Sequence, residues 1–192
     1  MPKANSYPKC LQEFYKRDIW EATLLDAKRD YLDNANYFIK PRYEFKTFTG
    51  FNIQGTTDNN KDINKITNKY KHKYPIYCSE LIKIISEYRV YVANNKILEI
   101  VHYWDNEIYD KNIIKNAKIN EKIVKRAVQT LSNSDENLDG YAIDFAIIEN
   151  GDTVLLELNK GFSIDSYTAS DETYYKVIKS RWDELINKSL KK

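Results

Sequence analysis

The feature that most constrains the fold is a β-hairpin signal in the C-terminal half of the chain. Two apolar stretches, residues 141–148 and 153–159, flank an Asn150-Gly151 pair. Asn-Gly is the preferred pair for a two-residue hairpin turn in which both residues have positive φ. Counting outward from such a turn places Asp144 directly opposite Glu157, on the same face of the hairpin. The sequence therefore predicts two carboxylates that face each other within an apolar setting.

These facing acids predict a metal site. Their Cβ atoms would lie roughly 4.5–5.5 Å apart, and Asn159, two residues beyond Glu157, shares their face. Two carboxylates in such a position repel each other unless a cation or a proton lies between them. Carboxylate and amide oxygens are hard ligands of the kind that Mg²⁺ accepts. We therefore predict that Asp144, Glu157 and Asn159 hold a divalent cation; a solvated face with two ordinary acids is the alternative.

Helical and strand patterns occur along the whole chain and predict an α+β fold. Its 192 residues suit a single domain. The spacing of apolar residues predicts helices over residues 11–32, 119–131 and 171–190. Strands are expected over residues 37–39, with an interruption at Lys40-Pro41, over 51–54, and in a hairpin that joins 87–92 to 97–103 through Asn94-Asn95. Residues 56–74 are expected to form a loop or a frayed helix.

The scarce residues exclude several classes of site. With 5 glycines, the chain can form neither a phosphate-binding P-loop motif nor a dinucleotide fingerprint. The 2 histidines are too far apart in sequence for an HExxH zinc motif. A net charge of +2 argues against a protein whose main work is coating nucleic acid. No apolar run approaches the length of a membrane span, and a signal-peptide core is missing, so we expect a cytoplasmic protein without a membrane partner.

Three basic residues lie in predicted non-helical segments. Lys40 ends a short apolar strand, Lys46 lies in the threonine-rich segment KTFTG, and Arg89 interrupts an apolar strand. A magnesium site implies a polyphosphate ligand, and phosphates need cations. Each of the three, taken alone, also fits a surface side chain that is solvated or ion-paired. Together with the acidic hairpin, they predict a site for a nucleotide.

Four segments resemble the ATP-grasp superfamily, and more closely a small clade, common in bacteria and their phages, that is named for an arginine and two lysines. They are FIKPRYEFKTFTGF, SELIKIISEYRVYV, YAIDFAIIENGDTVLLELNKGFSIDSY and a late RW pair. The resemblance runs from about Leu11 to Trp182. It implies an ATP-grasp fold, in which two α+β subdomains with antiparallel sheets and flanking helices sandwich a nucleotide. We expect an N-terminal helix and smaller lobe over about residues 1–79 and a larger, metal-binding lobe over 80–192.

The resemblance also implies roles for individual residues. Lys40 and Lys46 match the two lysines that contact the nucleotide phosphates. Arg89 matches the arginine that faces a phosphate or the acyl-phosphate transition state, so that Arg89 and Lys46 are the expected catalytic residues. The segment that contains Glu80 and Leu81 resembles the hinge where backbone groups hold the adenine and an acid approaches the ribose.

For the C-terminal half, the resemblance implies the same metal ligands as the hairpin argument, with Lys160 and Ser163 as weaker candidates for substrate contacts. Many relatives have Asn-x-Arg where this chain has Asn159-Lys160-Gly161, and lysine does not reproduce the two-pronged grip of arginine on a carboxylate. Only about 35 residues precede FIKP. We therefore expect recognition of the acid substrate to be reduced, or to be supplied by a partner or by a second subunit in a homodimer.

The implied activity is ATP-dependent ligation of a carboxylate to an amine or a thiol through an acyl phosphate. Its cofactors would be ATP and Mg²⁺, with Mn²⁺ as an alternative ion, and a peptide or a protein is one class of substrate. A non-catalytic nucleotide-binding or interaction protein with a degenerate site is the first alternative. A protein that binds single-stranded nucleic acid through its tyrosines and the basic run 61–73 is the second, although such a run is more typical of a solvated loop.

Overall fold

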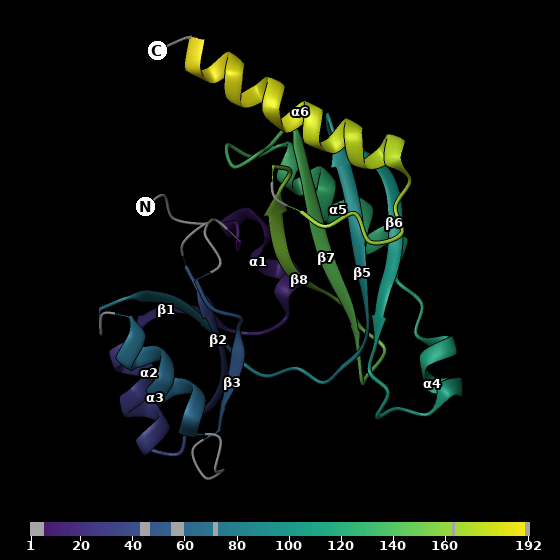
Figure 1. Ribbon diagram of the computed structural model, residues 1–192. Coiled ribbons are helices and arrows are strands. Elements are labelled where there is room, and N and C mark those ends of the chain that lie inside the picture. The colour runs from purple at the N-terminus through teal and green to yellow at the C-terminus, as the bar shows by residue number, and fades with distance from the viewer. Residues whose placement is uncertain (1–5, 43–46, 55–59, 71–72, 163, 191–192) are drawn as a thin grey trace. The chain divides into compact units, whose positions relative to one another are not determined.

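A computed structural model describes residues 6–42, 47–54, 60–70, 73–162 and 164–190, and all statements below concern these residues. They form two compact units, one of residues 17–82 and one of residues 6–16 with 83–192 (Figure 1). Within the described ranges, no helix is long and apolar enough to cross a membrane.

The first unit is a four-stranded antiparallel sheet that carries two helices on one face. The strand order is β1-β4-β2-β3. In chain order the elements are β1 (Ile19–Thr23), α2 (Leu24–Leu32), β2 (Asn36–Pro41), β3 (Phe51–Gln54), α3 (Asn60–Lys69) and β4 (Pro75–Ser79). Leu24 and Ala27 of α2 and Ile63 of α3 pack with Ile39 and Ile76 of the sheet in one buried cluster. Because both helices join this cluster, the unit has its own hydrophobic core.

The predicted helix over residues 11–32 is wrong at its centre. The first helix ends at Tyr15, the residue after it, Lys16, has a φ of 49°, and strand β1 follows before α2 begins. β1 pairs with β4 along its whole length, so tertiary pairing overrides the helical spacing of the apolar residues. Thr23 then starts α2 through a capping box, in which its hydroxyl accepts from Asp26 N and the Asp26 carboxylate accepts from Thr23 N.

Strand β2 also differs from the prediction, because it continues through Lys40 and Pro41. These two residues pair with Tyr77 and Ile76 of β4. Pro41 is the last residue of the strand, where a missing backbone donor is tolerated. Strand β3 has the predicted bounds, and α3 lies within the segment 56–74 that was expected to be a loop or a frayed helix.

The second unit contains a four-stranded antiparallel sheet with strand order β6-β5-β7-β8. Its elements are η1 (Lys9–Leu11), α1 (Gln12–Tyr15), β5 (Ile84–Ala93), β6 (Lys96–Asp105), α4 (Lys111–Asn116), α5 (Glu121–Ser132), β7 (Gly140–Ile148), β8 (Thr153–Lys160) and α6 (Asp171–Leu190). In Figure 1, α5 lies behind the strands and α6 crosses in front of them near one end. Val177 of α6 packs against Tyr91 and Ala142 of the sheet. The helix predicted over 119–131 corresponds to α5, and the one predicted over 171–190 corresponds to α6, so both are confirmed.

The two hairpins of this sheet close in different ways. Asn94 and Asn95 have φ values of 49° and 64°, which confirms the predicted two-residue turn between β5 and β6. Between β7 and β8, only Gly151 has a positive φ, of 84°. Gly151 N donates to Ile148 O, and Ile148 N donates to Asp152 O, so the loop has three residues instead of the two predicted.

A bulge in β8 reverses the offset that the longer loop introduces. Phe145 lies opposite Leu155, whereas Asp144 lies opposite Glu157, so Leu156 is an extra residue in β8. The predicted pairing of Asp144 with Glu157 is therefore confirmed, although the turn that was expected to produce it is not.

Candidate active site

The centre of the candidate site is a row of charged residues across the second sheet. Arg89 of β5 lies opposite Asp144 of β7, which in turn lies opposite Glu157 of β8. The Arg89 guanidinium donates from Nε to Asp144 Oδ1 and from Nη2 to Oδ2, both at 2.8 Å. The two side chains are 7% and 4% exposed. The sequence predicted Arg89 and the carboxylate pair as site residues, but not that Arg89 pairs with Asp144.

Arg89 supplies positive charge that the facing carboxylates require. Burial raises the pKa of Asp144, and the hydrogen bonds and charge of Arg89 oppose that rise. The negative charges of Glu157 and Glu87 add to the rise. Because a bidentate pair with arginine favours the ionised carboxylate, Asp144 is held as an anion inside the sheet.

The oxygens around this pair fit a divalent cation such as Mg²⁺. Asn159 Nδ2 donates to Asp144 Oδ2 at 2.9 Å, so Oδ2 accepts two hydrogen bonds and Oδ1 accepts one. A carboxylate oxygen has two lone pairs, which leaves acceptor capacity on Oδ1. The amide oxygen of Asn159 and the half-buried Glu157 carboxylate complete a set of hard donors. In the described part of the chain, no group of three or more His, Cys, Asp or Glu side chains converges as a metal site. The predicted set has only two such residues, Asp144 and Glu157, because its third member is Asn159.

Two aromatic rings lie beside the Arg89 guanidinium, a feature that the sequence did not reveal. The centroid of the Tyr167 ring lies 4.7 Å from Arg89 Cζ, and that of Tyr103 lies 5.8 Å away. The two rings stack on each other with centroids 4.3 Å apart and an interplanar angle of 4°. Planar guanidinium groups are attracted to the faces of aromatic rings.

Glu87 is a second residue of the site that sequence reasoning missed. It lies two residues before Arg89 in β5, so the two side chains share a face. Its carboxylate accepts a short hydrogen bond from Tyr103 Oη. Desolvation raises the pKa of Glu87, and the charge of Glu157 adds to that rise. Glu87, Arg89 and Tyr91 occupy every second position of EYRVY, and this spacing could have predicted from the sequence that their side chains share one face of the strand.

Four of the residues predicted to contact a substrate or nucleotide belong to the first unit, and the structure describes three of them. Lys40 is buried in β2. Glu80 is tied to the start of β1, because its carboxylate accepts from Asp18 N at 2.8 Å and its own N–H donates to Asp18 O. Leu81 is half-buried beside it. Lys46 lies outside the described residues.

The remaining two predicted residues are Lys160, at the end of β8, and Ser163. Lys160 ends β8 opposite Tyr141. Since successive side chains of a strand alternate, Lys160 and Asn159 lie on opposite faces. Ser163 lies outside the described residues. The structure thus brings Arg89, Asp144 and Asn159 into contact, and it places Glu157 next to them by strand register.

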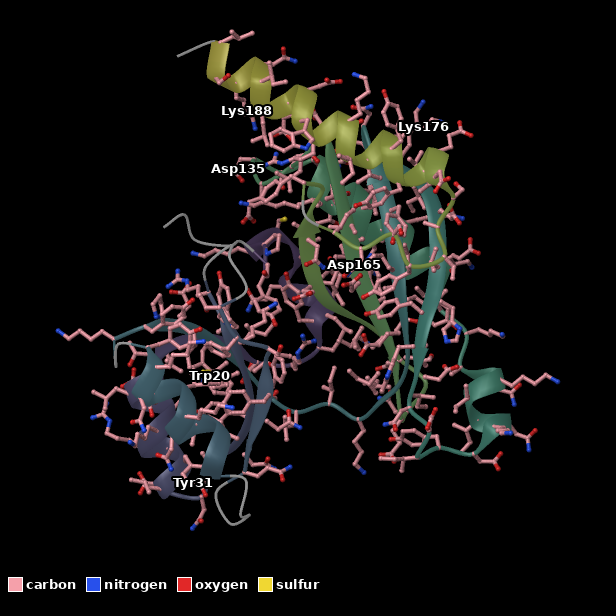
Figure 2. All side chains as sticks on the ribbon, in the orientation of Figure 1. Trp20, Tyr31, Asp135, Asp165, Lys176 and Lys188 are labelled. Atoms are coloured by element: carbon pink, nitrogen blue, oxygen red, sulfur yellow. The ribbon has the colours of Figure 1, made fainter. Side chains whose placement is uncertain are left out.

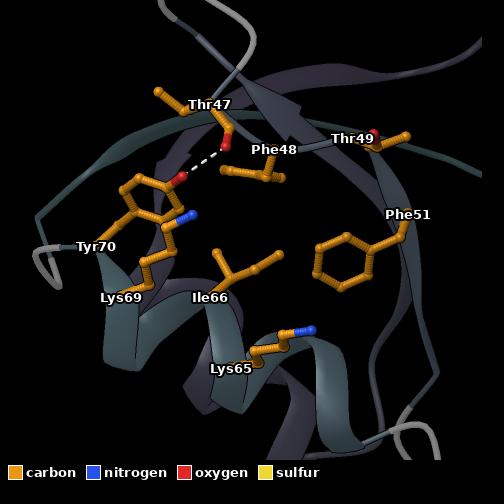
Figure 3. A pocket seen from close by; sticks show the side chains of 9 residues that line it. Thr47, Phe48, Thr49, Phe51, Lys65, Ile66, Lys69 and Tyr70 are labelled. Carbon is orange, nitrogen blue, oxygen red and sulfur yellow. Dashed lines mark hydrogen bonds between the residues drawn. The ribbon is translucent and has the colours of Figure 1, made fainter.

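A pocket of about 390 Å³ lies within the first unit, between residues 47–51 and α3 (Figure 3). Its lining consists of Thr47, Phe48, Thr49, Gly50, Phe51, Lys65, Ile66, Lys69 and Tyr70. The Thr47 hydroxyl pairs with the hydroxyl of Tyr74, and Thr47 O accepts from Tyr70 Oη. The pocket therefore presents mainly aromatic and aliphatic groups, with two lysines on its helical wall.

Comparison with known proteins shows which family the chain matches. A family model for an ATP-grasp domain, described as family 2 of the clade named for one arginine and two lysines, matches residues 14–177. No curated protein sequence matches the chain.

Among solved structures, the ATP-grasp ligase PsnB in complex with a minimal precursor is 15% identical, with a TM-score of 0.54 over 93% of this chain and 57% of PsnB. The D-alanine–D-alanine ligase of Bacillus anthracis is 15% identical, with a TM-score of 0.52 over 95% of this chain and 65% of the ligase. N5-carboxyaminoimidazole synthase of Aspergillus clavatus, solved with ADP and its ribonucleotide, is 14% identical, with a TM-score of 0.57 over 91% of this chain and 49% of the synthase. These likenesses confirm the predicted α+β, ATP-grasp fold, and the chain spans 57% of the length of PsnB.

Proposed function

Because the chain belongs to the ATP-grasp family, within family 2 of the clade named for an arginine and two lysines, we propose that it is an ATP- and Mg²⁺-dependent ligase that joins a carboxylate to an amine or a thiol. The observation that carries the proposal is the row formed by the buried Arg89 and Asp144 and the half-buried Glu157, with Asn159 hydrogen-bonded to Asp144. Three hard oxygen donors beside a fixed arginine suit a site for a metal-bound polyphosphate. Neighbours of the same fold solved with Mg and ADP support these cofactors.

In the proposed reaction, the substrate carboxylate attacks the γ-phosphorus of ATP, which releases ADP and forms an acyl phosphate. The amine or thiol then attacks the acyl carbon, and phosphate leaves. A bound Mg²⁺, held by Asp144, Glu157 and Asn159, would neutralise phosphate charge during the first step. Arg89 holds Asp144 in place, and burial of the pair strengthens its field.

The lysines have a separate task in this proposal. Lys40, which is buried at the end of β2, and Lys46 would bind phosphate oxygens directly as cations. Such contacts stabilise the charge that develops on the transferred phosphoryl group. A peptide or a protein is one class of substrate in this proposal, and PsnB, which has the same fold, is solved with a minimal precursor. A nucleotide-binding protein that has lost ligation is the alternative.

Nucleotide binding provides the direct test. Thermal unfolding and isothermal titration would be compared with and without MgATP for the native chain, Glu157→Gln and Glu149→Gln. Glu149 is a matched control because it pairs with Lys83 on the surface, at the turn of the same hairpin. A ligand at 100 times its dissociation constant should stabilise the native protein by about 2.7 kcal/mol.

We expect a Mg²⁺-dependent stabilisation in the native chain and in Glu149→Gln, and a much smaller one in Glu157→Gln. ADP release in the presence of candidate acids and amines would then identify the reaction. An absence of stabilisation by any nucleotide would overturn the proposal. Binding of MgATP without ADP release under any substrate would favour the non-catalytic alternative.

A further inference from the structure

The guanidinium of Arg89 uses three of its donors on groups of its own chain. A guanidinium has five N–H donors. Two of them bind Asp144, and Nη1 donates to the backbone carbonyl of Asp165 at 3.3 Å. At most two donors therefore remain for a ligand. The orientation in which Arg89 is held decides where those donors point and which oxygen of Asp144 stays accessible.

The segment that covers Arg89 is fastened to the sheet through its backbone. Tyr91 Oη lies 2.7 Å from the carbonyl oxygens of both Asp165 and Ser166, and Tyr91 itself is fully buried. Figure 2 shows Asp165 over the strands of the second unit. Tyr91 and Arg89 both belong to β5 and lie on the same face, so one strand anchors the segment at two points.

Tyr167 follows directly and adopts an unusual backbone conformation. Its φ is 46°, in the left-handed region that side-chain-bearing residues rarely occupy. Such a conformation persists where surrounding contacts over-determine it, and it often marks a functional site. Here the contacts are the Tyr103 ring, stacked in parallel at 4.3 Å, and the Arg89 guanidinium at 4.7 Å. The Tyr167 hydroxyl has no hydrogen-bond partner among the described residues, so the ring carries these interactions.

We propose that Tyr167, supported by Tyr103, is a positioning residue that holds the Arg89 guanidinium in the plane in which it grips Asp144. The inference rests on the proposed function, because its consequence is a correctly oriented metal ligand. Arginine has a long side chain with high rotamer entropy. An aromatic ring that confines the guanidinium lowers the entropic cost of keeping both hydrogen bonds to Asp144. The ring also keeps water away from the Arg89–Asp144 pair.

The test compares substitutions of Tyr167 that separate the roles of its hydroxyl, its ring and its volume. Tyr167→Phe retains the ring and removes the hydroxyl, Tyr167→Leu fills part of the volume without a π face, and Tyr167→Ala removes both. In all three variants, a residue with a side chain must still adopt the positive φ of position 167, because none of them introduces glycine. Tyr175→Ala is the matched control, since Tyr175 is a tyrosine on α6 that is 62% exposed.

Two readouts are needed. The first is the dissociation constant of MgATP, measured by titration calorimetry. The second is the exchange rate of the Arg89 Nε–H proton with water, measured by NMR without nucleotide and assigned through its loss in Arg89→Lys. We expect Tyr167→Phe and Tyr175→Ala to stay within twofold of the native protein in both. Tyr167→Leu and Tyr167→Ala should bind MgATP at least tenfold more weakly and exchange Nε–H at least tenfold faster.

Native-like MgATP affinity and native-like Nε–H exchange in Tyr167→Leu would overturn the positioning role. Weaker affinity in Tyr167→Leu with unchanged Nε–H exchange would also overturn it, because Tyr167 would then act on the nucleotide directly. If the native chain binds no MgATP, the proposed function fails, whereas the exchange measurement still decides whether Tyr167 positions Arg89. Circular dichroism of each variant verifies that it is folded, and Tyr167→Leu provides the decisive comparison if Tyr167→Ala does not fold.

Discussion

Arg89 and Asp144 face each other on the two central strands of the second sheet, and the guanidinium binds both carboxylate oxygens at 2.8 Å. The pair is almost completely buried. It therefore has two roles in the proposals above, because it neutralises a carboxylate inside the sheet and it orients a candidate metal ligand. Its stability and its function can be separated by experiment.

Removing one partner of this pair should be strongly destabilising. Asp144→Ala leaves the Arg89 guanidinium buried without its counter-charge, and breaking such a pair costs about 3–5 kcal/mol. Urea unfolding would measure the loss. The control is Asp152→Ala, which breaks the exposed pair with Lys16 and should cost less than about 1 kcal/mol. Equal losses in the two variants would mean that Arg89 finds another partner or water when Asp144 is removed.

Substitutions of Lys40 and Glu157 should weaken ATP binding with a different dependence on Mg²⁺. If Lys40 binds phosphate directly, Lys40→Ala should weaken ATP binding about tenfold or more, both with Mg²⁺ and with EDTA, because a charge-assisted hydrogen bond contributes about 1.5–3 kcal/mol. Glu157→Gln should weaken binding only when Mg²⁺ is present. Titration calorimetry of both variants and of the exposed control Lys96→Ala checks this. A Glu157→Gln effect of equal size in EDTA would argue against a metal ligand.

Gly140 should not tolerate a side chain. A Cβ atom there would lie 2.2 Å from Val177 O and 2.7 Å from Arg181 N, so α6 would have to move away from β7. Overpacking of this kind costs about 1–3 kcal/mol or more, and chemical denaturation of Gly140→Ala would measure it. Gly151→Asn is the control, because nothing lies near its Cβ and asparagine accepts a positive φ. A Gly140→Ala protein with native stability would show that α6 shifts at no cost.

Glu184 should make the free energy of unfolding of the second unit fall at acid pH. Burial by itself raises the pKa of Glu184, but hydrogen bonds from Lys188, Asp139 N and Arg181 outweigh it and lower the pKa below the usual value. A depressed carboxyl pKa stabilises the folded state above the unfolded pKa, about 4.3, and this contribution is lost as pH falls through the folded pKa.

The free energy of unfolding would therefore be measured between pH 7 and pH 3 for the native chain and for Glu184→Gln. We expect the native protein to lose more stability than the variant over the acid end of this range. A variant that loses as much stability as the native protein would assign the acid sensitivity to other carboxylates.

The amino-acid sequence determined the features that depend on neighbouring residues. Asn94-Asn95 specifies its own turn, because asparagine adopts positive φ more readily than most residues. The bounds of α6 agree with the helix predicted over 171–190. Its buried residues, however, are Thr173, Val177, Arg181 and Glu184, whereas the apolar Trp182 and Ile186 are exposed, so apolar spacing alone did not identify the buried face. The predicted pairing of Asp144 with Glu157 is correct, but the two-residue turn from which it was derived is not, because a three-residue loop and a bulge in β8 together give the same register.

Tertiary structure decided the features that depend on distant residues. Residues 19–23 form a strand because β4 offers them a partner, although their apolar spacing also suits a helix. Arg89 reaches Asp144 across a separation of 55 residues, and Tyr91 fastens the segment before Tyr167 across 74. Such contacts depend on strand order and register over the whole sheet, which no local pattern encodes. Arg89, Asp144 and Glu157 could therefore be named from the sequence, whereas Glu87, the pairing of Arg89 with Asp144 and the aromatic rings beside it became apparent only in the folded chain.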